Sequence, residues 1–421
     1  MEKMMRITTS RMRNTGKWKK LCVVPTALLF LCAGLAPCGA RGYAFNYIVA
    51  DMRQPVSVSG GSACPVPAHF LTSAASINRR WSTALNTNPV SVLTVDQTAA
   101  GRLNEIEAVI QSSFATWAGV SGASLTGSSL GPLGRSGAQN ACAADGVNSI
   151  CFDQSDAAFT PGVLAFTRVM VADRIGETLG AATSSEVGQI LDADIELNPG
   201  DPQATFATPA ALPNAPSAYD LESILTHELG HFLGFSHSAV WPAMMYPFAP
   251  SPGTFTGDRP TSQAPDAPLS NDDRTGLRAL YPDPSDTVNV GTISGRILAA
   301  NPLSLPSAPA GVTGLFGAYV VAMDANSGEV LAGVLGGWTC SGAGPAQFDG
   351  GFRLTHLPVG TGRSYKIYAE PLNGTVDPSQ VSNATATLCR NALTDPGWPA
   401  PSACVVPGVT TNLMARVRPG P

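Results

Sequence analysis

Apolar residues recur at helical spacing in several parts of the chain before residue 284, and short apolar runs separate these parts. In the segment Leu103–Ala118, the apolar side chains stand three or four residues apart and so share one helical face. These residues are Ile106, Val109, Ile110, Phe114 and Trp117. The predicted elements that follow the same reasoning are helices over Ala218–Leu233 and Asp272–Leu280, and strands over Pro89–Val95, Ser149–Asp153, Val163–Val171 and Ala193–Leu197. This mixture predicts an α+β domain over residues 45–283.

Helical periodicity is absent after residue 288, where strand-like runs recur instead. The runs are Thr292–Leu298, Ala318–Met323, Gly351–Leu357, Tyr365–Glu370 and Thr411–Val417. The turn-forming stretch Asn326-Ser327-Gly328 lies between two runs. The pattern predicts a small antiparallel β-sandwich over residues 291–421, joined to the first domain by a linker over residues 284–290.

The N-terminal segment has the pattern of a targeting sequence. A basic stretch, Met1–Lys20, precedes the apolar run Leu21–Ala36. We predict a signal peptide over residues 1–40, cleaved after Ala40 or, as an alternative, after Ala44. The protein is then secreted and has no membrane partner after signal removal. An uncleaved N-terminal anchor is the other interpretation of the same pattern.

Composition and charge narrow the classes of protein. Charged residues make up 13% of the chain, while Gly and Pro occupy 43 and 35 positions, which excludes a coiled coil and a charge-driven disordered chain. Residues 1–40 hold seven of the 25 Lys and Arg but only one of the 30 Asp and Glu, so the remainder has a net charge of −11. A nucleic-acid partner is therefore not expected.

Six cysteines remain beyond the predicted signal peptide: Cys64, Cys142, Cys151, Cys340, Cys389 and Cys404. An even number in an exported protein indicates disulfides. We predict the pairs Cys142–Cys151 and Cys389–Cys404, because each closes a short polar loop. Cysteine-ligated zinc is not expected, since no two cysteines have the C-x-x-C spacing.

Three of the five histidines fall within eleven residues at the end of the second predicted helix. His227 and His231 are one helical turn apart, so both imidazoles lie on one face and can bind the same ion. Gly234 can end the helix in a left-handed conformation, which allows His237 to reach the ion as a third ligand. Three neutral imidazoles leave one tetrahedral position open, as in catalytic zinc sites. Packed or solvated histidines are the structural alternative.

Glu228 directly follows the first predicted ligand. Zinc lowers the pKa of a bound water towards about 7 and polarises a carbonyl group. The Glu228 carboxylate would take the proton of that water as general base and pass it to the leaving nitrogen. The helix is expected to begin with a capping box formed by Ser217 and Asp220.

The pattern H-E-x-x-H-x-x-G-x-x-H resembles the zinc signature of metzincins, and the residues after it resemble the matrixin family. Ala243-Met244-Met245-Tyr246-Pro247 is similar to the matrixin Met-turn, which implies that Met245 lies beneath the zinc, with Met244 as the alternative. The resemblance extends over about residues 80–283. It implies a twisted, mostly parallel sheet with three helices, one catalytic Zn²⁺, and a protein or peptide substrate.

The same resemblance implies roles for residues outside the zinc signature. Gly162–Thr167 would be the edge strand that pairs with the substrate backbone. Asp272 and Asp273 would anchor the Met-turn and the N-terminal segment, although capping of the third helix by Ser270 and Asp273 also accounts for them. A Ca²⁺ site is implied, with three candidate ligands. They are Asp192, Asp194 and Asp201.

The chain also departs from the matrixin pattern. The Arg-Cys-Gly motif of the prosegment is missing, and a disulfide is the better explanation for its only candidate, Cys64. The His-rich loop of a second zinc site is absent. His69 and His356 are isolated and are expected to be structural.

The strand rhythm after residue 290 resembles carboxypeptidase regulatory-like or transthyretin-like sandwich domains, which implies a surface or matrix ligand. Taken together, the sequence predicts a secreted zinc-dependent endopeptidase with Glu228 as general base. A non-catalytic adhesion or binding protein on a metzincin scaffold and a processing protease of narrow specificity are the alternatives.

Overall fold

The computed structural model of the chain describes residues 4–8, 44–45, 47–48, 66–71, 79–82, 92–96, 98–125, 133–136, 142–152, 162–172, 174–198, 205–238, 243–254, 268–298, 318–335, 339 and 349–371. Within them, helices are interspersed among strands up to α3 (Asn271–Leu280), after which only strands follow. None of the described helices is both long and apolar enough to cross a bilayer. The apolar run of the predicted signal peptide, Leu21–Ala36, lies outside the described residues.

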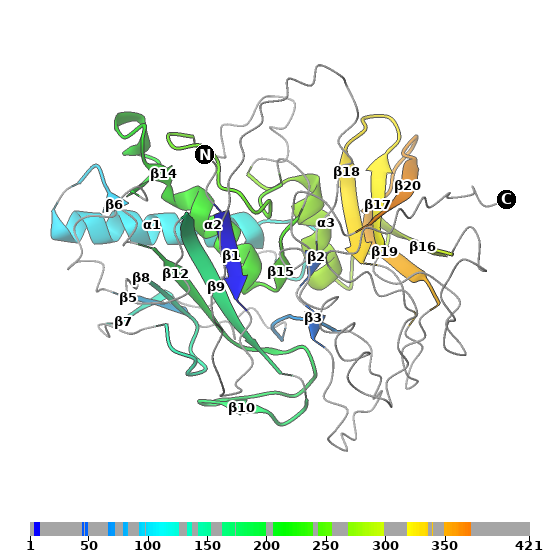
Figure 1. Cartoon of the computed structure of the whole chain (residues 1–421), viewed down its shortest axis with the longest axis horizontal. Coiled ribbons are helices and arrows are strands. Elements are labelled where there is room, and N and C mark those ends of the chain that lie inside the picture. Colours follow the sequence, from blue (N-terminus) through cyan, green and yellow to red (C-terminus); the bar gives the residue numbers. More distant parts are fainter. Residues whose placement is uncertain are drawn as a thin grey trace, which may run out of the picture.

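A six-stranded sheet forms the centre of the larger part of the molecule (Figure 1). Its strands, in spatial order, are β1 (Met4–Thr8), β9 (Val163–Val171), β12 (Ile190–Leu197), β8 (Ser149–Phe152), β5 (Arg79–Ser82) and β7 (Leu133–Ser136). β9 runs antiparallel to β12, and the other neighbouring pairs are parallel. The sheet therefore has the mostly parallel arrangement that the sequence resemblance implies.

Short strands pair around this sheet. β6 (Val92–Leu93), β13 (Phe206–Ala207) and β14 (Tyr219–Asp220) form a three-stranded sheet. The two-stranded pairs are β2 (Ala44–Phe45) with β15 (Phe235–Ser236), β3 (Tyr47–Ile48) with β4 (Val66–Pro67), and β10 (Thr178–Leu179) with β11 (Ala182–Thr183). A 3₁₀-helical turn covers Leu212–Asn214. Two-residue strands are too short to produce an alternating pattern, which is why the sequence predicts few of them.

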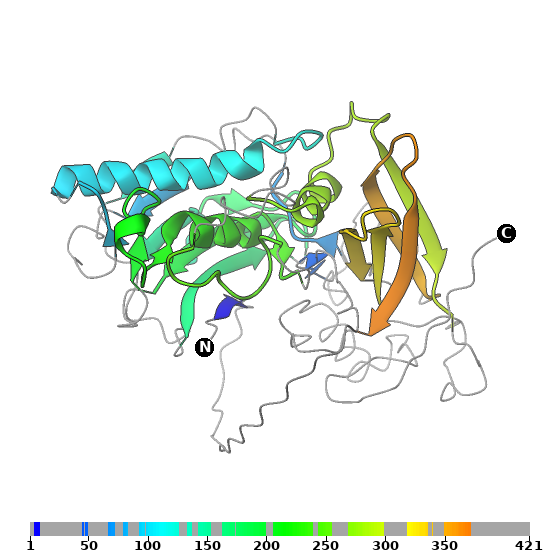
Figure 2. The same cartoon turned by 90° about the horizontal axis from the view of Figure 1, so that it is seen from above.

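Helix α1 (Ala99–Ala118) begins four residues before the predicted start, because the Thr98 side chain accepts a hydrogen bond from the Gly101 amide and caps the helix. The predicted apolar face of α1 is buried, including Trp117. Figures 1 and 2 show α1 beside α2 (Leu221–Phe232), and α2 in turn packs against β9 and β12.

The start of α2 differs from the prediction. The helix begins at Leu221 rather than Ala218, since Tyr219 and Asp220 pair with β13. The predicted capping box of Ser217 and Asp220 is wrong. Instead Asp220 is itself the capping residue, and its carboxylate accepts a 2.6 Å hydrogen bond from the Ser223 amide.

The cysteines within the described residues form one disulfide. Cys142 and Cys151 are bonded, as predicted, and join the segment before β8 to β8 itself. The predicted pair Cys389–Cys404 lies outside the described residues, as do Cys64 and Cys340.

In the described part of the chain, five antiparallel strands follow α3. β16 (Val290–Arg296) pairs with β19 (Gly351–Pro358), while β17 (Ala318–Asp324) lies between β18 (Val330–Leu335) and β20 (Tyr365–Pro371). Both views place α3 between these strands and the central sheet (Figures 1 and 2). The apolar pattern of the sequence does not delimit β18, and the predicted strand Thr411–Val417 lies outside the described residues.

One strand lies where the sequence analysis expected none. Met4–Thr8, in the basic part of the predicted signal peptide, forms β1 and pairs in parallel with β9. β9 is therefore not the edge of the sheet in the described structure, contrary to the expectation for Gly162–Thr167. A strand edge presents unpaired amide and carbonyl groups, and the backbone of β1 satisfies them.

Candidate metal centre

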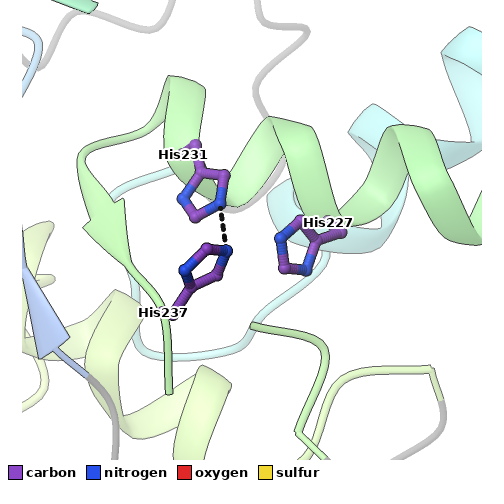
Figure 3. Close-up of side chains that lie close together, drawn as sticks. All are labelled: His227, His231 and His237. Carbon is purple, nitrogen blue, oxygen red and sulfur yellow. Dashed lines mark hydrogen bonds between the residues drawn. The ribbon is translucent and has the colours of Figure 1, made fainter. Parts of the chain in front are cut away.

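The three histidines of the signature converge at the end of α2. His227 and His231 project from one face of the helix, and His237 returns towards them after β15 (Figure 3). One nitrogen of each ring lies within 4.8 Å of the others, and all three side chains are buried. Among the described residues, this is the only group of three or more His, Cys, Asp or Glu compact enough to hold a metal ion.

Gly234 allows the chain to reverse direction between the end of α2 and β15. Its φ of +108° lies in the region that residues with a side chain rarely adopt. A Cβ at this position would also lie 2.0 Å from the Ala68 carbonyl oxygen. Both constraints require glycine, and the turn they permit carries His237 to the other two histidines.

Backbone carbonyls fix the orientation of two imidazoles. His227 Nδ1 donates to the Met244 carbonyl at 2.6 Å, and His231 Nδ1 donates to the Phe235 carbonyl at 2.9 Å. With Nδ1 protonated in a neutral ring, the lone pair is on Nε2. His227 Nε2 is buried and has no hydrogen-bond partner among the described residues, so a metal would satisfy it.

The spacing of the nitrogens fits zinc. His231 Nε2 and His237 Nε2 are 3.2 Å apart. Two tetrahedral Zn–N bonds of ordinary length place their nitrogens about 3.3 Å apart. Burial lowers the pKa of His227 to about 4 and, together with the neighbouring imidazoles, lowers that of His231 well below its usual value. Both rings are thus neutral at pH 7, as metal ligands must be.

Glu228 is fully buried beside the first histidine. Its Oε2 accepts a 2.6 Å hydrogen bond from the Thr167 hydroxyl of β9, whereas Oε1 has no hydrogen-bond partner among the described residues. Burial raises the pKa of this carboxyl group to about 8, and the Thr167 hydrogen bond opposes the rise. A metal cation nearby would also favour the ionised form.

The residues of the expected Met-turn lie below α2. A Cβ on Gly230 would lie 2.1 Å from Met245 Sδ, which shows how closely this methionine packs against the helix. Met245 is fully buried, while Met244 supplies the carbonyl that holds His227. Of the two residues that follow in the predicted turn, Pro247 is buried and Tyr246 is partly exposed.

Asp273, at the start of α3, holds this turn, and Asp272 beside it contacts the residue after the third histidine. Asp273 accepts hydrogen bonds from the amides of Met244 (2.7 Å) and Met245 (3.1 Å). It also forms a capping box with Ser270, so Asp273 both holds the Met-turn and caps α3. Asp272 accepts a 2.8 Å hydrogen bond from the Ser238 hydroxyl.

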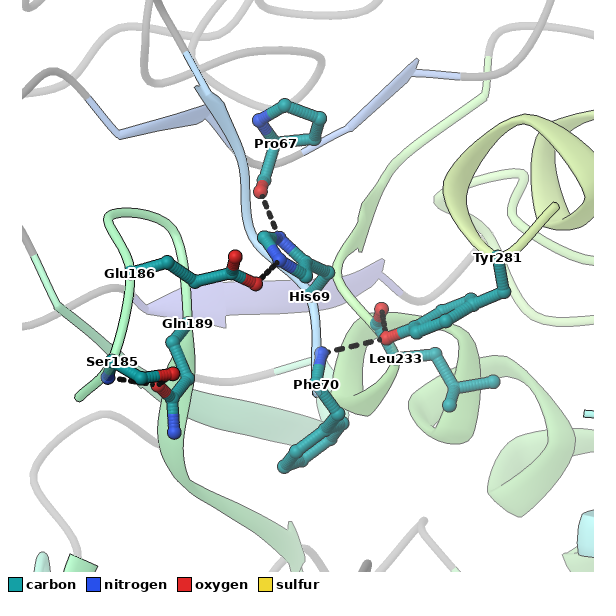
Figure 4. A network of polar contacts seen from close by, with 8 residues as sticks. All are labelled: Pro67, His69, Phe70, Ser185, Glu186, Gln189, Leu233 and Tyr281. Carbon is teal, nitrogen blue, oxygen red and sulfur yellow. Dashed lines mark hydrogen bonds and ion pairs between the residues drawn. The ribbon is translucent and has the colours of Figure 1, made fainter. Parts of the chain in front are cut away.

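A hydroxyl group connects the N-terminal segment to the end of α2. Tyr281 accepts a hydrogen bond from the Phe70 amide at 3.0 Å and donates one to the Leu233 carbonyl at 2.7 Å (Figure 4). In the same region, His69 contacts Glu186 at 2.6 Å and the Pro67 carbonyl at 2.8 Å. His69 thus connects two segments of the chain, and neither His69 nor His356 of β19 belongs to the metal-binding group.

The candidate calcium ligands lie on β12. Asp192 accepts hydrogen bonds from the amides of Asp145 (2.9 Å) and Gly146 (3.2 Å), and Asp194 accepts one from Ser149 (3.0 Å). Burial and the neighbouring Asp192 raise the pKa of Asp194 to about 9. Asp201 lies outside the described residues.

The site has the features of a metal-dependent hydrolase: a buried triad of neutral imidazoles with a carboxylate beside the first. Comparisons with known proteins narrow this class. Residues 170–282, which include α2, the triad and α3, match the model of the matrixin family.

Three plant proteins are similar to this chain. Metalloendoproteinase 1-MMP of Arabidopsis thaliana is 38% identical over 95 residues, which are 20% of this chain and 23% of that protein. Metalloendoproteinase 2-MMP of Arabidopsis thaliana is 36% identical over 111 residues, 26% of this chain and 25% of that protein. Metalloendoproteinase 1 of Glycine max is 42% identical over 65 residues, 15% of this chain and 18% of that protein. The chain thus spans a quarter or less of the length of each of these relatives, all of which are named metalloendoproteinases.

Proposed function

We propose that this protein is a secreted zinc-dependent endopeptidase in which Glu228 acts as general base. The observation that carries the proposal is the convergence of three buried imidazoles, two of them oriented by backbone carbonyls, beside a carboxylate with one unpartnered oxygen. His227, His231 and His237 would hold the metal, and Met245, Tyr246 and Pro247 would form the turn beneath it. Gly234 permits the geometry.

Each residue has a distinct task in peptide hydrolysis. Zinc bound by the triad supplies an activated water and polarises the scissile carbonyl. Glu228 receives a proton on its unpartnered oxygen and returns it to the leaving nitrogen. The backbone of β9 would pair with the substrate chain, which requires the β1 segment to leave that edge.

The test is cleavage of a mixed peptide library by the purified protein. We expect chelator-sensitive cleavage that Glu228→Ala reduces by about 10²–10⁴-fold, because proton transfer is lost. The zinc content of the variant should stay at that of the wild type, since the three imidazoles are intact. The matched control is Glu222→Ala, which changes another glutamate of α2, one that accepts a hydrogen bond from the Ser112 hydroxyl. This variant should retain the activity of the wild type.

The negative outcomes separate the alternatives. A folded, zinc-loaded wild type that cleaves no peptide would replace the endopeptidase by a binding protein on the same scaffold. Cleavage confined to very few sequences would indicate a processing protease. A wild type that binds no zinc would rule out the proposed chemistry.

Export also belongs to the proposal. Removal of residues 1–40 as a signal peptide would take β1 away from β9 and uncover the edge for substrate. N-terminal sequencing of the exported protein tests this, and an intact Met1 would argue for the anchor instead.

The strands after residue 290 would form a sandwich that binds a surface or matrix ligand, which a binding assay with isolated matrix polymers can test.

We propose in addition that Asp192 and Asp194 bind Ca²⁺. Both carboxylates are buried on the same strand, and a cation would favour the ionised form of Asp194, whose pKa is raised by burial and by the neighbouring Asp192. Calcium should raise the melting temperature of the wild type more than that of Asp194→Asn. Equal shifts in the two proteins would exclude Asp194 as a ligand.

A further inference from the structure

A threonine on β9 contacts the carboxylate that serves as general base in the proposed function. Thr167 Oγ1 lies 2.6 Å from Glu228 Oε2 and 3.0 Å from the carbonyl oxygen of the same residue. Thr167 has a single hydroxyl hydrogen, Oε2 is the closer acceptor, and in the ionised form that acts as general base the carboxylate is also the stronger acceptor. The hydroxyl therefore donates to Oε2.

The strand itself does not require a hydroxyl at this position. Side chains at every second residue of a strand share one face, so Thr167 lies on the same face as Ala165 and Val169. Both of these residues are apolar and buried. Valine has the shape of threonine and would suit the same face, whereas a buried hydroxyl without a partner is costly. The contact with Glu228 accounts for the polar group.

A glutamate side chain has several rotatable bonds, and a free carboxylate can adopt several orientations. The hydrogen bond to Oε2 selects one orientation of Glu228. Oε1 then remains without a hydrogen-bond partner among the described residues, so it is the oxygen available for a proton. Holding a reacting group in one orientation before the reaction lowers the barrier.

We propose that Thr167 is a positioning residue for Glu228: it holds Oε2 so that Oε1 is the oxygen that exchanges protons during peptide hydrolysis. This inference rests on the proposed function. It also gives β9 a second role, because the strand expected to bind the substrate backbone carries the group that orients the base. Substrate and base are thus aligned by one rigid element.

The experiment compares Thr167→Val and Thr167→Ser in the full chain. Valine should reduce kcat by about 10–100-fold and leave KM within about twofold, because orientation of the base and not substrate affinity is lost. Serine keeps the hydroxyl and should restore kcat to within about threefold of the wild type. Zinc content and melting temperature, measured on each variant, show that the proteins are loaded and folded.

Two controls make the result specific. Thr275→Val changes another fully buried threonine, in α3, and should leave kcat unchanged. In a Glu228→Ala background, Thr167→Val should cause no further loss, since its effect acts through the carboxylate. A crystal structure of Thr167→Val should show Glu228 in more than one orientation.

The possible failures are distinguishable. Chelator-sensitive turnover that Thr167→Val leaves unchanged, or a loss that persists in the Glu228→Ala background, would overturn the positioning role alone. Equal losses in the serine and valine variants would do the same. A zinc-loaded wild type without turnover would overturn the proposed function, and the positioning role with it.

Discussion

Asp220 shows how a single buried carboxyl group makes stability depend on pH. Burial raises its pKa from 3.8 to about 6, although hydrogen bonds from Ser223 favour the ionised form. The folded chain therefore binds the proton of Asp220 more tightly than the unfolded chain does, so protonation stabilises the fold. Its contribution to stability is complete below about pH 4 and is lost as the pH rises through 6.

We predict that Asp220→Asn removes this pH dependence. Between pH 4 and pH 7, the free energy of unfolding of the wild type should fall by up to about 3 kcal/mol relative to the variant, since each pKa unit corresponds to about 1.4 kcal/mol. Asparagine is an equally good capping residue, so the helix start is preserved. Urea denaturation of both proteins across this range measures the difference. Parallel curves would show that Asp220 does not titrate in the range.

At the same scale, the sequence predicts some residues of the candidate site and misses others for a physical reason. His227, Glu228 and His231 lie within one helical turn or so, and local spacing brings them together regardless of the rest of the fold. Thr167 is 61 residues away and meets Glu228 only through the packing of β9 on α2. A single threonine in a strand does not belong to any recognisable sequence motif, so the sequence alone does not predict its contact with Glu228.

Helix α3 supports the site without contributing a metal ligand. One carboxylate, Asp273, accepts hydrogen bonds from two amides of the turn, and Met244 of that turn holds His227. The chain of contacts runs from α3 through the turn to an imidazole. The start of α3 thereby determines the orientation of a residue on α2.

We predict that Asp273→Asn weakens zinc binding by about 10–100-fold, the usual cost of removing a group that orients a metal ligand. The asparagine amide has nearly the same shape as the carboxylate. Its NH₂ group, however, cannot accept a hydrogen bond, so one of the two backbone N–H groups of the turn loses its acceptor. Competition with a chelator of known affinity measures the loss.

Ser270→Ala is the control for helix capping alone. It should cost about 1 kcal/mol of stability and leave zinc affinity within about twofold of the wild type, because Asp273 still holds the turn. If both variants bind zinc equally well, Asp273 acts only as a capping partner.

The elements themselves were predictable in proportion to their length and periodicity. The long strand β9 has the predicted bounds, and α3 begins one residue before the prediction. β5 and β7 were not predicted, since each is only four residues long and contains arginine and serine in place of an apolar alternation. The start of α2 was misplaced because pairing of β14 with β13 competes with helix formation there.

On the scale of the whole molecule, the two parts of the chain share one hydrophobic core. Buried residues of the C-terminal strands, among them Val320 and Leu354, belong to the same cluster as Leu277 of α3 and Leu233 at the end of α2. Asn271 of α3 also donates a 2.9 Å hydrogen bond to Glu329 beside β18. The spacing of apolar residues distinguishes the C-terminal strands from the preceding part of the chain, but this spacing does not show which surfaces of the two parts pack together.

The hydroxyl of Tyr281 has a consequence for the order in which the protein is made. Its two partners, Phe70 and Leu233, are 211 and 48 residues earlier in the chain, so neither hydrogen bond can form before residue 281 has been made. A ribosome that has released α2 but not residues 270–281 has produced the histidines without the helix that fixes their surroundings. The growing chain therefore carries the three histidines before it carries the helix and the tyrosine that fix their surroundings.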